Sequence, residues 1–173
     1  MNWWKAALFD TCSLITLDKA LLERADLATH FPSSILALEE SFSVDQLRAE
    51  TSRRMRPRVT PCPLPTPVDL AGILDSTIVP QSLSTVDKLV YAAAVHYQIA
   101  VVTADKQLAR AVKAKDIHVG NVALILRELV HAKSLTVKDC EEVLLGLAYR
   151  KDFIVGGRAT PHWTDLQDYT FPD

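Results

Sequence analysis

The sequence has few glycines and no glycine-rich loop. Five glycines occur among 173 residues, and only Gly156 and Gly157 lie close together. Neither G-x-G-x-x-G nor G-x-x-x-x-G-K-[ST] can be found anywhere in the chain. Both motifs use glycine backbone to approach nucleotide phosphates. The sequence therefore predicts no nucleotide cofactor.

Long apolar runs and paired cysteines are also absent. The longest candidate run, 89–103, is interrupted by polar residues at 96–98, so no membrane span is expected. The first ten residues carry one lysine and reach an aspartate, which is unlike a secretory signal. An odd number of widely spaced cysteines predicts neither a disulfide framework nor a zinc ribbon. We therefore expect a cytoplasmic protein; the cysteines are Cys12, Cys62 and Cys140.

Charge of either sign is not in excess. The chain has 19 basic and 21 acidic residues and a net charge of −2. This balance indicates no nucleic-acid or membrane partner by itself. The length fits one domain that can bury a core without a staple.

Short apolar runs alternate with segments of helical periodicity. Strands are predicted at 6–9, 99–103 and 116–119. Helices are predicted at 13–27, 33–52, from Ser84 or Thr85 to 95, 106–115, 121–132 and 137–149. Five prolines between 57 and 67 predict an extended connection across 53–67. The tail from 151 is expected to be irregular.

This alternation predicts an α/β fold with a parallel sheet and helices on both faces. In such sheets functional residues lie at the carboxyl ends of the strands. The two clearest strands end there in Asp10 and Asp105.

Four acidic residues lie in or beside apolar segments. Each alone fits a cap, a turn or a solvated helix face. Together they indicate a cation, because carboxylates near buried strand ends are costly unless compensated. Several converging carboxylates suit Mg²⁺ or Mn²⁺. The four are Asp10, Glu39, Asp87 and Asp105.

The segments that hold these acids resemble the PIN domain family over residues 6–120. They are DTCSLI at 10–15, the helical Glu39, STVDKLVYAAA at 84–94 and VVTADKQLA at 101–109. The resemblance implies a three-layer α/β/α sandwich with a central parallel sheet. It places a nuclease core at 1–120, a helical extension packed on it at 121–150, and an irregular tail at 151–173.

The resemblance also implies a metal-dependent nuclease, usually acting on RNA. The chain is similar to the virulence-associated protein C toxins, which a small antitoxin protein inhibits. A homodimer is common in the family. Asp10, Glu39, Asp87 and Asp105 would be catalytic. Asp10 and Asp105 would be direct ligands of one or two Mg²⁺ or Mn²⁺ ions, and the supporting hydroxyls would be Thr11 and Thr103.

Two features leave alternatives open. Glu40 rivals Glu39, because adjacent residues point about 100° apart on a helix. Cys12 stands where the family often has a small polar residue, so a hydroxyl role either passes to Ser13 or is absent.

No histidine motif offers a base, so hydrolysis would depend on the metal. An arginine-rich stretch beside the acids would contact RNA phosphates, or instead be a solvated surface or an antitoxin interface. Its proposed RNA-binding members are Arg53, Arg54 and Arg56. A non-catalytic PIN-like scaffold for RNA or protein and a DNA nuclease are the alternative functions.

Overall fold

One parallel five-stranded sheet forms the centre of the protein. The computed structural model describes residues 2–43, 47–75, 79–152, 154–155 and 158–171. The strand order is β3-β2-β1-β4-β5, and every neighbouring pair is parallel. The strands are β1 (Leu8–Phe9), β2 (Ile35–Ala37), β3 (Val59–Pro61), β4 (Val101–Val102) and β5 (Val119–Gly120).

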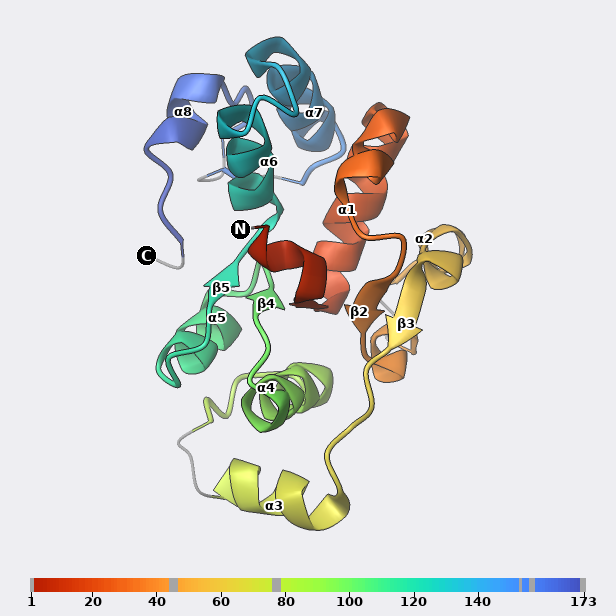
Figure 1. Ribbon diagram of the computed structural model, residues 1–173, viewed down its shortest axis with the longest axis vertical. Helices are drawn as coiled ribbons and strands as arrows, with labels where there is room; N and C mark the ends of the chain where they lie inside the picture. The colour runs from red at the N-terminus through yellow and green to blue at the C-terminus, as the bar shows by residue number, and fades with distance from the viewer. Residues whose placement is uncertain (1, 44–46, 76–78, 153, 156–157, 172–173) are drawn as a thin grey trace.

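Helices cover both faces of this sheet, which confirms the predicted three-layer α/β fold (Figure 1). Consecutive strand residues point to opposite faces. Phe9 and Val102 therefore join one apolar core, while Leu8 and Val101 join the other. The first core is covered by α1 (Thr11–Glu23), α6 (Val122–His131) and α7 (Val137–Tyr149). The second is covered by α3 (Pro67–Asp75), α4 (Thr85–Tyr97) and α5 (Lys106–Lys113).

Several helix starts follow from local capping chemistry. The Ser84 hydroxyl accepts from the backbone N–H of Asp87 and caps α4, which decides between the two predicted caps, Ser84 and Thr85. Thr136 and Asp139 form a reciprocal capping box at the start of α7. These caps satisfy backbone donors that a helix start otherwise leaves without partners.

The predicted helix at 33–52 is wrong. The segment instead holds β2, a 3-10 helix η3 (Glu39–Phe42), and the start of α2 (Ala49–Met55). Ile35 pairs with Val59 of β3, and Leu36 pairs with Leu8 of β1. A short apolar run fits either a strand or a helix, so tertiary pairing decided between them.

The proline-rich segment is extended only in part. After α2 and a 3-10 turn η4 (Arg56–Arg58), β3 lies at the edge of the sheet, where a proline is tolerated. The helix α3 then begins at Pro67, because proline at a first helical position removes no needed donor. The tail is also less irregular than expected, since it contains α8 (Trp163–Gln167). Two further 3-10 segments are η1 (Trp3–Ala6) and η2 (Ala25–His30).

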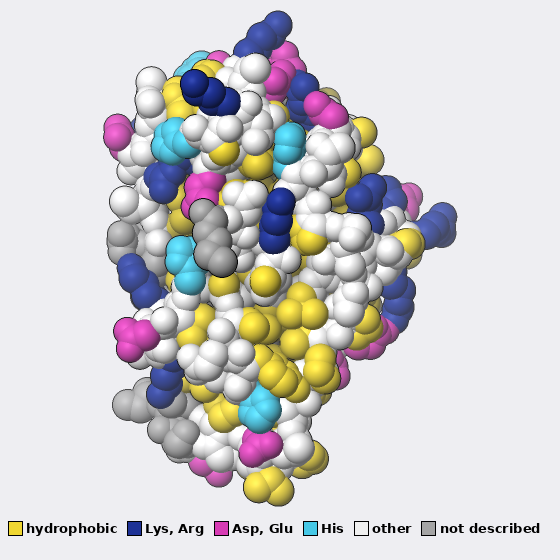
Figure 2. All heavy atoms as spheres, in the orientation of Figure 1, with side chains coloured by type: hydrophobic (Ala, Val, Ile, Leu, Met, Phe, Trp, Pro, Cys, Tyr) yellow, Lys and Arg dark blue, Asp and Glu magenta, His cyan; other side chains and the backbone are white. Residues whose placement is uncertain are grey.

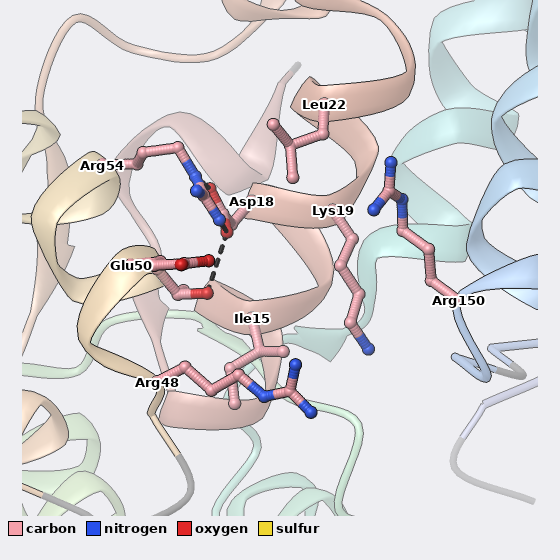
Figure 3. A pocket seen from close by; sticks show the side chains of 9 residues that line it. Ile15, Asp18, Lys19, Leu22, Arg48, Glu50, Arg54 and Arg150 are labelled. Carbon is pink, nitrogen blue, oxygen red and sulfur yellow. Dashed lines mark hydrogen bonds and ion pairs between the residues drawn. The ribbon is translucent and has the colours of Figure 1, made fainter.

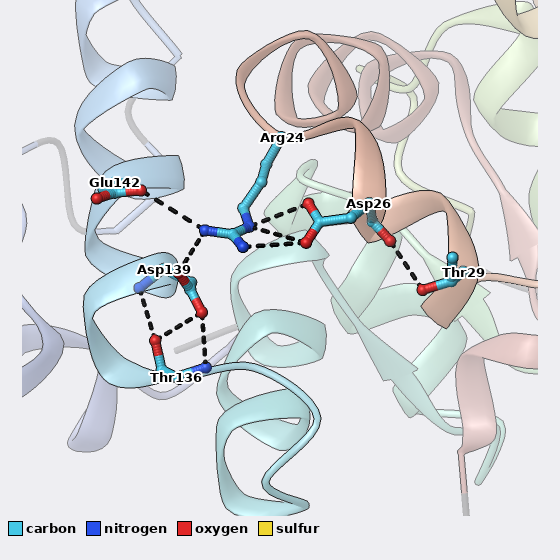
Figure 4. A network of polar contacts seen from close by, with 6 residues as sticks. All are labelled: Arg24, Asp26, Thr29, Thr136, Asp139 and Glu142. Atoms are coloured by element: carbon cyan, nitrogen blue, oxygen red, sulfur yellow. Dashed lines mark hydrogen bonds and ion pairs between the residues drawn. The ribbon is translucent and has the colours of Figure 1, made fainter.

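The C-terminal helices are part of the main core. Ile125 of α6 and Leu144 of α7 lie in the same buried cluster as Phe9 and Leu14. A polar network reinforces this packing, because the Arg24 guanidinium at the end of α1 binds Asp139 on α7 (Figure 4). Within the described residues, no helix is long and apolar enough to cross a membrane.

The contact between Gly120 and Trp3 predicts a site of tight packing. A Cβ at Gly120 would lie 2.6 Å from two atoms of the Trp3 ring. That ring is fixed by an indole N–H that donates to Glu128 at 2.9 Å. We expect Gly120→Ala to lower the free energy of unfolding by about 1–3 kcal/mol through overpacking, measured by urea denaturation.

Gly72 provides the matched control. A Cβ there would meet nothing within 4 Å, and the residue lies inside α3. Gly72→Ala should raise the free energy of unfolding by about 0.5–1 kcal/mol, because alanine is the better helix former. A Gly120→Ala protein as stable as the wild type would contradict the observed packing of Trp3.

Candidate functional site

The order in which the chain adds strands to the sheet reverses between the neighbouring strands β1 and β4. Chain connections run outward from this point toward β3 on one side and β5 on the other. Open α/β sheets bind ligands at such a switch point, outside the carboxyl ends of the strands. Asp10 directly follows β1, and Thr103 and Asp105 follow β4. The backbone N–H of Asp10 donates to the Val102 carbonyl at 3.1 Å, so the two strand ends lie together.

Asp10 is a buried carboxylate with neutral hydrogen-bond donors. Only 1% of its surface is exposed. It accepts from the Ser13 backbone N–H at 2.7 Å and from the Thr103 hydroxyl. Burial, with a smaller contribution from the charge of Asp87, raises the pKa of Asp10 from 3.8 to about 6 despite these bonds. The group is therefore a carboxylate whose desolvation is incompletely compensated.

Asp105 and Asp87 are fixed at helix starts near Asp10. Asp105 caps α5, because its Oδ1 accepts from the backbone N–H groups of Gln107 at 2.6 Å and Leu108 at 2.9 Å. Asp87 lies in the first turn of α4 and accepts from the Ser84 hydroxyl at 2.6 Å. Helix N-termini favour negative charge, which lets these carboxylates gather at one edge of the sheet.

The Cys12 thiol reports how these acids are arranged. Cys12 is exposed in the first turn of α1. Its pKa rises to about 12, first through desolvation and then through the charges of Asp10, Asp87, Asp105 and Asp152. The structure thus brings together three of the four acids singled out in the sequence.

Asp152 is a fourth acid at this place that sequence reasoning missed. It accepts from the Thr16 hydroxyl at 2.9 Å and from Lys19 Nζ at 3.0 Å. It follows α7 in a segment with no motif, and only the packing of α7 on α1 brings it near the site. Nothing in its local sequence could have identified it.

Glu39 lies at the same edge of the sheet but points elsewhere. It follows β2 in η3, which touches the site through the Thr11 hydroxyl, 3.5 Å from the Ser41 carbonyl. The Glu39 side chain is 52% exposed and pairs with Arg56. The structure therefore directs the Glu39 carboxylate to Arg56, and Glu40 beside it is half-buried.

The predicted arginines are engaged differently from one another. Figure 2 shows Lys and Arg side chains gathered at the right-hand edge of the molecule, over α2. Arg54 donates from Nε and Nη2 to the buried carboxylate of Asp18, at 2.8 and 2.7 Å. Arg56 binds Glu39 and lies 5.3 Å from the centre of the Phe42 ring. Arg53 is exposed.

The donor set fits a hard divalent cation bound partly through water. Within the described part of the chain, no three His, Cys, Asp or Glu side chains form a ready metal-binding group. Mg²⁺ commonly needs only one or two carboxylates, because it keeps several waters. Asp10, which has no cationic partner in the part of the chain that the structure describes, and Asp105 are the residues that would hold it. The buried hydroxyl of Ser41, whose carbonyl faces Thr11, has no hydrogen-bond partner among the described residues.

Comparison with known proteins gives no match: no family model, no curated protein and no solved structure is significantly similar to this chain. The chemistry at the switch point therefore carries the functional proposal that follows.

The buried charge of Asp10 predicts a pH-dependent stability. Between about pH 4 and 6 the folded protein binds more protons at Asp10 than the unfolded chain, so stability falls as the pH rises. The change in pKa from 3.8 to about 6 corresponds to about 3 kcal/mol. In EDTA at pH 7.5, Asp10→Asn should be more stable than the wild type by up to this amount. At pH 4 the difference should vanish, as measured by urea denaturation.

Asp75→Asn is the control, because Asp75 is exposed at the end of α3. It should follow the wild-type stability curve at every pH. If Asp10→Asn also follows that curve, Asp10 is not desolvated in the folded protein.

Proposed function

We propose that this protein is a metal-dependent nuclease of the PIN type that hydrolyses RNA. The observation that carries the proposal is the gathering of Asp10, Asp87 and Asp105 at the switch point of a parallel sheet. The resemblance of 6–120 to the PIN family supports it independently of that geometry. The glycine-poor sequence offers no phosphate-cradling loop, which favours a metal held by carboxylates as the group that acts on the scissile phosphate.

The residues have distinct parts in this proposal. Asp10 and Asp105 hold Mg²⁺ or Mn²⁺, and Asp87 adds negative charge beside them. The Thr103 hydroxyl binds Asp10 and accepts from the Asp105 backbone N–H at 3.0 Å, so it fixes both ligands relative to each other. Thr11 holds η3 against the start of α1. When bound, the metal lowers the pKa of a coordinated water and neutralises charge on the scissile phosphate.

A cytoplasmic location is expected from the odd number of widely spaced cysteines. Two further parts of the proposal, a homodimeric state and a small antitoxin as partner, come from the resemblance alone. RNA is preferred over DNA for the same reason. The pairing of Glu39 with Arg56 favours one alternative, a PIN-like scaffold that binds RNA or protein without cutting, because it leaves the acidic set incomplete.

Metal-dependent cleavage tests the proposal directly. The wild type should cleave structured RNA in Mn²⁺ or Mg²⁺ and lose activity in EDTA. Asp10→Asn and Asp105→Asn should each lower the cleavage rate by about 10²–10³-fold, comparable with loss of other groups that stabilise transition-state charge. Product formation is measured on labelled RNA by gel electrophoresis.

Asp168→Asn is the matched control, because Asp168 is exposed on the C-terminal segment. It should cleave like the wild type. Cleavage that survives both site substitutions would refute the metal-nuclease proposal. Parallel reactions on single-stranded and duplex DNA distinguish the DNA nuclease from the ribonuclease.

The two adjacent glutamates can be separated by the same assay. The exposed pair between Glu39 and Arg56 is worth only about 0–1 kcal/mol, so Glu39 can leave it when metal and RNA bind. We expect Glu39→Gln to lower the cleavage rate by about 10²-fold or more, the range for a positioned acid or base, and Glu40→Gln to retain activity. The opposite result would assign the role to Glu40.

A further inference from the structure

A mostly polar cleft lies between α1 and α2, and its lining includes none of the site residues Asp10, Asp87 and Asp105. Its volume is about 490 Å³. Only Ile15 and Leu22 of its nine lining side chains are apolar, so it does not suit a hydrophobic ligand. Arg150, from the end of α7, closes the side opposite α2 (Figure 3). The four cationic residues that line the cleft are Lys19, Arg48, Arg54 and Arg150.

These cations differ in how many donors they have left for a ligand. Arg54 directs two nitrogens to Asp18, which also accepts from the Thr51 hydroxyl at 2.9 Å, so this pair forms the neutral wall of the cleft. Arg150 donates from Nε to Glu23. A guanidinium has more N–H donors than one such contact uses.

Arg48 is the lining cation whose donors are least engaged by other described residues. Its side chain forms no ion pair with any described residue, and it projects into the cleft beside Ile15 (Figure 3). The one carboxylate of the lining besides Asp18 belongs to Glu50. The cleft thus presents basic side chains with donors to spare around a polar hollow, a surface that suits a phosphodiester.

One stripe of α1 connects this cleft with the aspartates. Cys12, Thr16 and Lys19 follow one another at spacings of four and three residues, which places them on one helix face. Thr16 and Lys19 both donate to Asp152, whose charge also acts on Cys12. At 1.5 Å per residue, Lys19 lies about 10 Å along the helix from Cys12. A few nucleotides of a single strand can span that separation.

We infer that this cleft binds the sugar-phosphate backbone of the RNA strand whose neighbouring phosphodiester lies at Asp10 and Asp105. The inference rests on the proposed ribonuclease function and adds to it a path for the substrate. Arg48, Lys19 and Arg150 contact phosphates along this path, and Arg54 positions α2 through Asp18. Binding there is independent of base sequence, because the contacts are to phosphates.

Binding without cleavage tests the cleft. A fluorescein-labelled single-stranded oligoribonucleotide is titrated with full-length protein in EDTA at several salt concentrations, and Kd is measured by anisotropy. Arg48→Gln with Arg150→Gln should raise Kd about tenfold or more at low salt. The slope of log K against log salt should fall by about 1.4, because each lost phosphate contact on a single strand contributes about 0.7.

A second double variant, Arg110→Gln with Lys113→Gln, removes the same charge from exposed positions on α5. It should stay within about twofold of the wild type, since phosphate contacts and not net charge set the salt slope. Equal losses in the two double variants, or no loss in either, would overturn the inference. Arg48→Gln alone should lower the slope by about 0.7, and it serves as the test if loss of the Arg150–Glu23 pair impairs folding.

The cleavage assay separates this inference from the proposed function. If the wild type cleaves RNA in Mn²⁺ and the cleft variant binds RNA as tightly as the wild type, RNA binding by the cleft is refuted. The proposed nuclease function is then unaffected. Binding that depends on the cleft, together with no cleavage under any metal, overturns the nuclease and supports the cleft as an RNA-binding surface.

Discussion

The arrangement of the protein depends on the burial of Asp10 at the end of a two-residue strand. Leu8 and Phe9 fill the two cores on either side of the sheet, and the chain then reaches a carboxylate with no further apolar residue between. That carboxylate caps α1 through Ser13 and binds the Thr103 hydroxyl at the end of β4. One side chain therefore ties the central strand, its helix and the neighbouring strand together, although its charge is costly to bury.

Among the described residues, the Asp10 carboxylate lies near other carboxylates and forms no ion pair with a basic side chain. Asp87 and Asp105 take positions at helix starts, where backbone N–H groups stabilise negative charge. Desolvation and these neighbouring carboxylates keep the Cys12 thiol protonated by raising its pKa. Carboxylate oxygens gathered beside the buried, desolvated Asp10 are the hard donors that Mg²⁺ or Mn²⁺ prefers.

Beyond the aspartates, α1 organises the surface. One face packs into the main core with α6 and α7, a second bears Asp18 and Leu22 toward α2, and a third leads from Cys12 to Lys19. The C-terminal helices are consequently part of the site. By packing on α1, α7 delivers Asp152 and Arg150 to the same surface. This places residues more than 130 positions apart in one electrostatic environment.

The sequence by itself determined the α/β class, the positions of Asp10 and Asp105 after their strands, and the start of α4 at Ser84 or Thr85. These depend on local apolar runs and capping residues, whose preferences act over a few positions. Only the tertiary structure decided that 35–37 is a strand, since pairing with β1 and β3 outweighs a helical pattern. It likewise decided that Arg54 binds Asp18, that Glu39 pairs with Arg56, and that Asp152 joins the aspartates. Those outcomes depend on which charged groups meet after folding, and neighbouring residues in a sequence carry no information about distant partners in space.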